Sequence, residues 1–415
     1  MREMKDSGLQ WAGDIPQYWN IAKGKHFMAV LERPVRDDDN VITCFRDGEV
    51  TLRSNRREDG FTVATVEAGY QGIEPGDLVV HGMDGFAGAI GISDSRGKGT
   101  PALNVLSCSE NKKYIMYLLR AMAYTEVFMA LSTGIRVRTC DTNWKKLKSL
   151  DYLIPPADEQ QCIADFLDAK CAEIDALTAD IQTQIDTLEQ YKRSVITETV
   201  TKGLNPNAEM KDSGIQWIGN MPAHWDVVRG KYILYYMQKP VREDDGVITC
   251  FRDGEVTLRS NRREEGFTMS DKEIGYQGID VGDLVVHGMD GFAGSIGISD
   301  SRGKASPVLN VLDTDQCKRY IMYYLRSMAY SDVFLALATG IRVRSCDLRW
   351  NKLAELSYPV PPLDEQNAIV KHIDSVLSKA EAVIADKKAQ LATLDEYKKS
   401  LIFEYVTGKK EVPVS

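Results

Sequence analysis

Hydrophobic residues recur every seven positions along two long segments of the chain. The series are Leu167, Ile174, Ile181, Leu188 and Val195 in the first segment, and Val370, Leu377, Ile384 and Leu391 in the second. A seven-residue repeat predicts α-helices that pack against one another along an apolar seam. Other apolar residues fall between and are expected to widen the seam: Leu177, Ile185 and Tyr191, then Ile373, Leu394 and Leu401.

Prolines and glycines mark the ends of these predicted helices. Pro155-Pro156 and Pro361-Pro362 stand where each helix would begin, followed by an acidic first turn. Gly203 and Gly408 suit the C-terminal stops. Each helix would run for about 40 residues, or about 60 Å. Such a helix needs a partner to cover its seam, and the other helix is the obvious one. The pattern alone leaves parallel and antiparallel packing open.

The segments before the helices alternate short β-like runs with turns. Residues 41–45 and 49–52 flank the turn Arg46-Asp47-Gly48, and the run 78–81 leads into a glycine-rich stretch, 82–91. Between Lys112 and Leu131 the period changes to that of a helix. One helical face is predicted there from Ile115, Leu118, Leu119, Met122 and Phe128. An α+β domain is therefore expected.

The whole pattern occurs twice, 206 residues apart, without an insertion or deletion: Trp19 corresponds to Trp225, and Pro155 to Pro361. Copies of about 200 residues indicate two domains of one kind rather than solenoid units. The expected layout is a mixed domain (1–153), a helix (154–204), a second mixed domain (205–359), a second helix (360–408) and a tail (409–415). A protein with internal two-fold repetition suits a two-fold target, and duplex DNA is the commonest of that size.

The net charge of −9 is concentrated in the long helices. Residues 158–196 hold nine acids and three bases, and residues 364–402 hold seven acids and six bases. The rest of the chain is close to neutral, so a local basic groove for phosphates remains possible. The eight cysteines form no C-x-x-C pair. With no apolar run of membrane-spanning length and no signal peptide, a reduced, cytoplasmic protein without a membrane contact is expected.

The sequence offers no catalytic motif. Gly97-Lys98 and Gly303-Lys304 lack the Ser or Thr that would complete a phosphate-binding P-loop. The Pro-Pro pairs lack the flanking residues that amino-methyltransferases use, and no S-adenosylmethionine site is visible. We therefore expect no catalytic residue, no metal and no cofactor. His81 with Asp84 could form a His–Asp dyad; a satisfied histidine at a strand end is favoured, and reading of a base edge is a third option.

Three blocks are identical in the two copies: 41–58 with 247–264, 76–88 with 282–294, and 90–98 with 296–304. The long helices have drifted by comparison. Buried packing alone rarely demands identical exposed Arg-Ser-Asn-Arg-Arg at 53–57 and 259–263. Arginine forks suit phosphates and guanine edges, and Asn55 or Gln71 could pair with adenine. A solvated, ion-paired surface is the alternative, because acids lie among the arginines.

The DNA-contact candidates lie mainly in the shared blocks. They are Arg46, Arg53, Asn55, Arg56, Arg57, His81, Arg96, Lys98 and Arg136 in the first copy, and Arg252, Arg259, Asn261, Arg262, Arg263, His287, Arg302, Lys304 and Arg342 in the second.

Three motifs occur in the same order in both copies. Each copy opens with a segment such as Lys-Asp-Ser-Gly-Ile-Gln-Trp (211–217), later has Thr-Gly-Ile-Arg (133–136 and 339–342), and ends with Pro-Pro-x-Asp-Glu-Gln (155–160 and 361–366). In these motifs and their order the chain resembles the specificity subunits of type I restriction–modification enzymes, over nearly its whole length.

The resemblance implies two target-recognition domains that each read one half of a bipartite DNA sequence. It implies antiparallel long helices that set the spacer, two methyltransferase subunits docked on the helical region, and restriction subunits added to that complex. The chain itself would catalyse nothing. Family members usually carry two different recognition domains, whereas these are nearly identical, so we expect an interrupted palindrome. Residues 63–68 and 269–274 differ at five of six positions, and would make the halves unequal if they contact bases.

Two other functions are less favoured. A DNA methyltransferase or nuclease acting alone would need a cofactor or metal site, which the sequence does not show. Binding of S-adenosylmethionine by the isolated chain would support that alternative. A structural adaptor, in which a coiled coil carries two protein-binding heads, would not explain the shared arginine blocks.

Overall fold

The computed structural model describes residues 2–56, 67–130, 142–262, 274–336 and 348–413. The chain divides into two compact units, residues 1–181 with 389–415 and residues 182–388. Each unit contains one mixed domain and part of both long helices. Among the described helices, none combines the length and the apolar composition that crossing a membrane requires.

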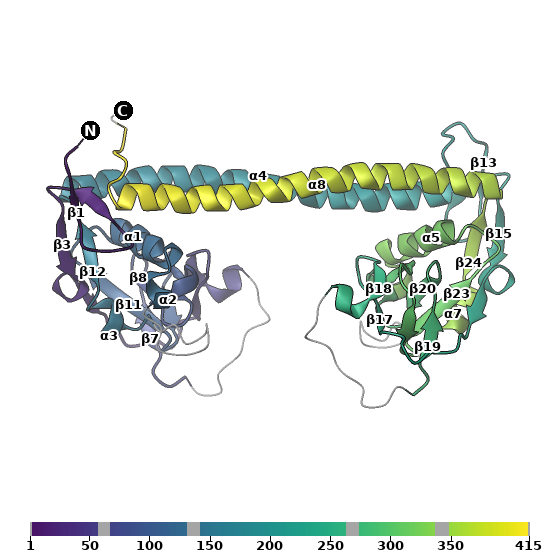
Figure 1. The fold of residues 1–415 in the computed structure, drawn as a ribbon, viewed down its shortest axis with the longest axis horizontal. Coiled ribbons are helices and arrows are strands. Elements are labelled where there is room, and N and C mark those ends of the chain that lie inside the picture. The colour runs from purple at the N-terminus through teal and green to yellow at the C-terminus, as the bar shows by residue number, and fades with distance from the viewer. Residues whose placement is uncertain (1, 57–66, 131–141, 263–273, 337–347, 414–415) are drawn as a thin grey trace. The chain divides into compact units, whose positions relative to one another are not determined.

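Unit 1 is built around an antiparallel four-stranded sheet in the order β4-β11-β8-β9, accompanied by the two-stranded pairs β1–β2, β3–β12, β5–β6 and β7–β10 (Figure 1). The strands are β1 (Met4–Asp6), β2 (Asp14–Pro16), β3 (Asn20–Lys23), β4 (Met28–Val30), β5 (Ile42–Cys44), β6 (Val50–Leu52), β7 (Gln71–Ile73), β8 (Leu78–His81), β9 (Ile90–Ile92), β10 (Gly97–Gly99), β11 (Leu103–Cys108) and β12 (Asp151–Ile154). The helices that begin here are η1 (Gly24–His26), η2 (Arg53–Asn55), η3 (Gly85–Ala87), α1 (Lys112–Tyr124), α2 (Val127–Ala130), α3 (Trp144–Leu147) and α4 (Ala157–Lys202).

Unit 2 repeats this plan, with the four-stranded order β16-β23-β20-β21. Its strands are β13 (Met210–Asp212), β14 (Asn220–Pro222), β15 (Asp226–Arg229), β16 (Tyr235–Met237), β17 (Ile248–Cys250), β18 (Val256–Leu258), β19 (Gln277–Ile279), β20 (Leu284–His287), β21 (Ile296–Ile298), β22 (Gly303–Ala305), β23 (Leu309–Asp313) and β24 (Ser357–Val360). Its helices are η5 (Gly230–Tyr232), η6 (Arg259–Asn261), η7 (Gly291–Ala293), α5 (Lys318–Tyr330), α6 (Val333–Ala336), α7 (Trp350–Glu355) and α8 (Leu363–Val406). The expected fold class, two similar α+β domains each followed by a long helix, is confirmed.

Helix α1 forms the middle layer of unit 1, between the sheet and the long helices. Leu78 and Val80 of β8 belong to the same buried cluster as Leu118 of α1 and Leu167 of α4. Val79 points the other way, into a smaller core beneath the pair β5–β6. Successive side chains of β8 point to opposite faces of the sheet, so the strand contributes to both cores. Through α1, the long helices and the β5–β6 hairpin are therefore parts of one packed body.

The sequence predicted one helix between Lys112 and Leu131, and this prediction is wrong at its C-terminal end. Helix α1 ends at Tyr124, and Glu126 adopts a left-handed conformation with φ of 60°. A residue in that conformation cannot continue a right-handed helix, so the chain turns and α2 begins at Val127. Asp332, with φ of 55°, makes the same break in the second copy.

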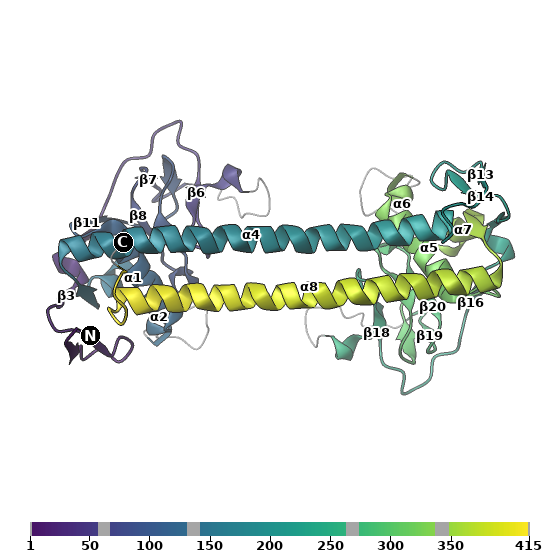
Figure 2. The ribbon, with the colours of Figure 1, turned by 90° about the horizontal axis from the view of Figure 1, so that it is seen from above.

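The long helices run antiparallel, as the resemblance implied. Helix α4 has 46 residues and α8 has 44. In unit 1 Asp175 of α4 pairs with Lys398 of α8 at 2.6 Å, and in unit 2 Lys192 pairs with Glu381 at 3.3 Å. The numbers in α4 rise while those in α8 fall, which only antiparallel helices allow (Figure 2). Gly203, with φ of 73°, follows α4, and Gly408, with φ of 70°, follows α8 closely.

The predicted seam is only partly right. Leu167, Ile174 and Ile181 are buried, but Leu177 and Tyr191 are 48% and 51% exposed. In α4 the other seam positions follow the heptad residues by four, as Cys171 and Ile185 do, and both of those are buried; in α8 they follow by three, as the buried Ile373 does. Leu177 and Tyr191 follow by three, which places them on the outer flank of the seam.

The motif that opens each long helix ties it to the rest of its unit. Gln160 is buried, and its Oε1 accepts a hydrogen bond of 3.0 Å from the backbone N–H of Asn111, just before α1. Glu159 accepts a hydrogen bond of 2.9 Å from Nε1 of the buried Trp19 in the opening segment. Gln366 repeats the role of Gln160 in unit 2. The shared motifs thus hold the helix start, α1 and the opening segment together.

We predict that Tyr114→Phe lowers the free energy of unfolding by about 1–3 kcal/mol. The hydroxyl of the fully buried Tyr114 donates to the backbone carbonyl oxygens of Leu153 and Val406, which lie 3.1 Å and 3.2 Å away. Removing it leaves buried carbonyl groups without that donor. Urea unfolding followed by circular dichroism measures the change. Tyr397→Phe, at an exposed tyrosine of α8, is the control and should have little effect; equal stability of the two variants would contradict the prediction.

Candidate nucleic-acid interface

The shared block 41–58 forms what we call the arginine hairpin, residues 42–56 in unit 1 and 248–262 in unit 2. Strands β5 and β6 pair with Ile42 opposite Leu52, and the turn closes with a hydrogen bond of 2.9 Å from Gly48 N–H to the Phe45 carbonyl. Gly48 has φ of 88°, a conformation that favours glycine. Helix η2 follows at once and carries Arg53 and Asn55. Most candidates of the first shared block therefore lie on one small element.

A buried arginine that the sequence did not single out holds the hairpin turn. Arg120 of α1 donates to the carbonyl of Gly48 at 2.9 Å and to that of Ile90 at 2.8 Å. A Cβ at Gly48 would lie 1.9 Å from Nη2 of Arg120, so the contact requires glycine. Arg326 makes the same two bonds in unit 2. The signal for this role was present, because Arg120 interrupts the apolar residues of a helix that is otherwise buried.

The hairpin arginines are held in place by carboxylates and by an aromatic ring. Arg46 is 68% exposed and pairs with Asp84 at 2.8 Å, while Arg56 pairs with Asp47 at 2.6 Å. The Arg56 guanidinium also lies 4.3 Å from the centre of the Phe45 ring, a cation–π arrangement. The mates repeat these contacts: Arg252 with Asp290, and Arg262 with Asp253 and Phe251. These side chains are thus presented in a fixed orientation.

Threonines of the hairpin fix the next two candidates. Arg53 donates from Nε to Oγ1 of Thr43 at 3.3 Å, and Asn55 donates to Oγ1 of Thr51 at 2.8 Å. Arg259 and Asn261 make the same contacts in unit 2. One of the two N–H groups of the Asn55 amide is therefore engaged, and this bond orients the amide without preventing a contact with adenine.

His81 and His287 lie at the start of what we call the histidine loop, residues 81–89 and 287–295. Nδ1 of His81 accepts backbone N–H bonds from Met83 at 3.2 Å and Asp84 at 3.0 Å. The nearest Asp84 carboxylate oxygen is 3.9 Å from the ring, too far for the hydrogen bond of a His–Asp dyad. Burial lowers the pKa of His81 below its ordinary 6.5. His287 shows the same bonds and the same direction of pKa shift.

Arg96 lies in a different cluster, away from the hairpin turn. Its guanidinium pairs with the buried Asp39 at 2.7 Å and also contacts Glu74. The hydrogen bond from Arg96 lowers the pKa of Asp39 to about 2. Lys98, on β10, pairs with Glu67 at 2.7 Å. In unit 2, Arg302 forms the corresponding ion pairs with Asp245 and Asp280. Lys304, which corresponds to Lys98, lies on the matching strand β22. Because Arg96 and Arg302 are partly buried and form ion pairs within the fold, a structural role is favoured for these two arginines.

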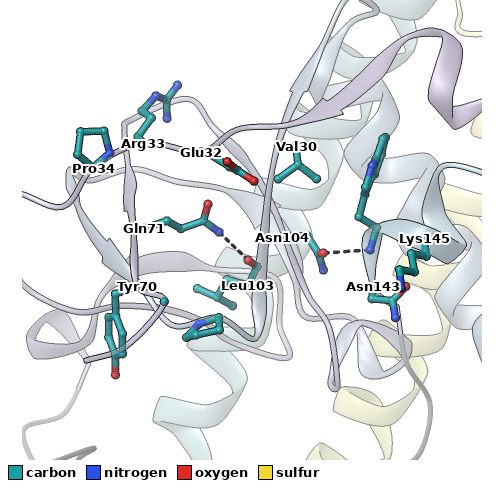
Figure 3. A pocket seen from close by; sticks show the side chains of 13 residues that line it. Val30, Glu32, Arg33, Pro34, Tyr70, Gln71, Leu103, Asn104, Asn143 and Lys145 are labelled. Carbon is teal, nitrogen blue, oxygen red and sulfur yellow. Dashed lines mark hydrogen bonds between the residues drawn. The ribbon is translucent and has the colours of Figure 1, made fainter. Parts of the chain in front are cut away.

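A cavity of about 740 Å³ lies in the mixed domain of unit 1 (Figure 3). Its wall includes Gln71, whose Nε2 donates to the carbonyl of Leu103 at 2.8 Å. This bond uses one of the two N–H donors of the amide group that was considered for pairing with adenine. In unit 2, Tyr236 replaces Val30 and stacks on Trp350 with ring centroids 5.9 Å apart. The two domains therefore share the hairpin surface but differ at this wall.

Four candidates lie outside the described residues: Arg57, Arg136, Arg263 and Arg342. Residues 63–66 and 269–273 also lie outside the described residues. They belong to the divergent segments that would make the two DNA half-sites unequal if they contact bases. The structure describes the remaining candidates in two groups. One group surrounds the hairpin and the histidine loop, and the other lies at β10 and β22.

Comparison with known proteins agrees with this architecture. The chain is 24% identical to the putative type I restriction enzyme MjaX specificity subunit of Methanocaldococcus jannaschii, over 96% of this chain and 95% of that protein. It is 18% identical to the StySPI specificity subunit of Salmonella potsdam, over 96% and 90% of the two chains. No family model matches the chain.

A solved structure from a type I restriction–modification system has the same fold. It superimposes with a TM-score of 0.66 at 13% identity, covering 95% of this chain and 99% of the other. The resemblance seen in the motifs is confirmed: this chain is similar to type I restriction enzyme specificity subunits along nearly its whole length.

The lowered pKa of His81 and His287 predicts that stability falls below about pH 6.5. In the unfolded chain these residues bind a proton near their ordinary pKa, whereas in the folded chain they do so only at lower pH. The unfolded state therefore binds more protons in this window, and acid favours it. The stabilisation is fully present above pH 6.5 and is lost as the pH falls toward the folded pKa.

Urea unfolding between pH 7.5 and 5 measures this loss. The double variant His81→Asn, His287→Asn should lose less stability on acidification than the wild type, because Asn accepts the two N–H bonds but does not titrate. Identical pH profiles for the two proteins would contradict the prediction.

Proposed function

We propose that this chain is the DNA-sequence-recognition subunit of a type I restriction–modification complex. One observation carries the proposal: the arginine hairpin and the histidine loop occur twice with the same internal contacts. A protein needs two copies of one polar surface when it must recognise one short sequence twice. The names of the relatives support this assignment. The two half-sites would be inverted copies within an interrupted palindrome.

The contacts to DNA would come from the exposed hairpin arginines first. Arg46 and Arg56, with Arg252 and Arg262, are oriented by carboxylates and could exchange these partners for phosphates or guanine edges. His81 and His287 lie beside them. Arg57, Arg136, Arg263 and Arg342 remain candidates from the sequence. Arg96, Lys98, Arg302 and Lys304 would contribute mainly by supporting the surface.

The long helices would supply the other functions of the subunit. We propose that they set the spacer between the half-sites and dock two methyltransferase subunits, to which restriction subunits are added. On this proposal the chain catalyses nothing itself and works in the cytoplasm, without a cofactor.

The test is to co-express this chain with the methyltransferase encoded beside it and to map methylated adenines by single-molecule sequencing. We expect one interrupted palindrome whose methylation depends on this chain. A bipartite but asymmetric motif would retain the recognition role and overturn the two-fold interpretation. Methylation that does not depend on the chain would overturn the proposal and favour a structural adaptor.

Charge reversal at the hairpin separates a DNA-binding subunit from an adaptor. Arg53→Glu with Arg56→Glu, and the matching changes at Arg259 and Arg262, should weaken DNA binding strongly. The slope of log K against log salt should become shallower by about 0.9 for each phosphate that the protein no longer neutralises. Lys170→Glu, on an exposed face of α4, is the control. Unchanged DNA affinity in the hairpin variant, with an intact fold, would contradict DNA binding by this surface.

A further inference from the structure

His287 faces a surface hollow of about 500 Å³ beside the arginine hairpin of unit 2. The wall includes Phe251, Arg252, Arg262 and the carboxylates Asp253 and Asp290. The side chain of His287 is 18% exposed and lines this hollow, so part of it is accessible to a ligand there. The hollow lies where the histidine loop meets the hairpin through the ion pair Arg252–Asp290.

The backbone determines which ring nitrogen of His287 carries the proton. Nδ1 accepts N–H bonds from Met289 at 3.2 Å and from Asp290 at 3.0 Å. A nitrogen that accepts hydrogen bonds must present its lone pair, so in the neutral ring the proton is on Nε2. Nε2 lies 3.9 Å from the Asp290 carboxylate, which is beyond hydrogen-bond distance.

The same bonds fix the ring of His81, through Met83 at 3.2 Å and Asp84 at 3.0 Å. The loop residues from His81 to Gly88 are identical to those from His287 to Gly294, and only the last loop residue differs, Ala89 against Ser295. Each domain therefore holds one histidine whose Nε2–H is a donor and whose Nδ1 already accepts hydrogen bonds from the backbone. Such a ring cannot act as a general base through Nδ1.

We propose that Nε2–H of His81 and of His287 donates a hydrogen bond to an acceptor on a DNA base edge, a purine N7, in each half-site. This inference rests on the proposed function and gives the histidines a reading role in it. An N7 atom accepts in the major groove of both adenine and guanine, so one donor there distinguishes purine from pyrimidine.

The charges around the hollow favour a base edge over a phosphate. Asp253 and Asp290 bring two carboxylates to the wall, and both already pair with the arginines there. Arg252 and Arg262 balance these two carboxylates, so the wall has no net charge, and a neutral imidazole adds none to attract a phosphate to His287. A base edge carries no net charge. It can meet a neutral donor without breaking the ion pairs.

Burial also keeps these rings neutral, because it lowers the pKa of both histidines. A neutral ring with a fixed tautomer presents the same donor throughout the physiological pH range.

The experiment uses the full-length chain and duplex DNA that carries the mapped methylation motif. Single purines of the motif are replaced in turn by their 7-deaza analogues, which lack the N7 acceptor. The wild type should lose about five- to tenfold in affinity at one purine of each half-site, the value of one hydrogen bond. The double variant His81→Asn, His287→Asn keeps an oxygen near the Nδ1 position and has no group at Nε2.

The variant should bind the unmodified duplex less tightly by a similar factor per half-site and become insensitive to 7-deaza replacement at those purines. The salt slope should not change, because the variant still neutralises the same phosphates. His372→Asn, the same substitution at an exposed position of α8, is the matched control and should behave as the wild type. Thermal melting checks that the fold is intact.

The outcomes are distinguishable. If the Asn variant binds as tightly as the wild type, or keeps its sensitivity to 7-deaza replacement, the inference is overturned while DNA recognition stands. If the Asn variant binds less tightly but the wild type loses no affinity at any 7-deaza purine, the histidines contact a group other than N7 and the base-edge role is wrong. A wild-type chain that does not prefer the mapped duplex over a scrambled one would count against the proposed function itself.

Discussion

A helix of 46 residues with an apolar stripe along one side is stable only when another surface covers that stripe. Here the antiparallel helix of the other repeat covers the apolar stripe. The mixed domains depend on this helix pair, because each of them bonds to the helix of the other repeat. Tyr114, in the first repeat, bonds to the carbonyl of Val406 on the second repeat's helix. Tyr320, in the second repeat, bonds to the carbonyl of Val200 on the first repeat's helix. Each domain is therefore seated partly on the other repeat, and neither repeat can complete its own core.

The same packing reaches the polar surface through α1. That helix contacts the long helices on one side, and on the other its Arg120 holds the hairpin turn at Gly48. A buried guanidinium that donates to carbonyls, as that of Arg120 does, is costly unless the geometry is good. Both copies keep this arrangement. The hairpin turn is consequently held by the core, and its arginines pair with carboxylates, so that the surface they form carries both signs of charge.

Much of the architecture was predictable because it depends on local patterns. The heptads, the proline pairs and the glycine stops located both long helices, and the alternation with turns located β5, β6 and β8. The prediction failed where it needed geometry beyond the pattern. Leu177 and Tyr191 are apolar but lie three rather than four residues after a seam position, and a left-handed Glu126 ends α1 in a way that no composition signal announces.

The candidate site was predictable only as a set of residue types. Repetition pointed to the arginines, but not to what holds them. Arg96 and its partner Asp39 are 57 residues apart, and Arg120 is 72 residues from Gly48. Such pairings depend on the topology of the sheet, which spacing along the chain does not encode. The tautomer of His81 likewise follows from two backbone N–H groups whose direction only the folded loop determines.

The division of the chain into units also affects the order in which it can fold during synthesis. Unit 2 is continuous, from Gln182 to Lys388, whereas unit 1 combines the first 181 residues with the segment from Ala389 onward. A ribosome releases the N-terminal part first. Unit 2 can therefore complete its core while unit 1 still lacks the part of α8 that begins at Ala389. Until those residues emerge, the cluster that contains Leu167 and Ile174 lacks its side chains from α8, and the nascent chain exposes an apolar surface that its C-terminal segment must later cover.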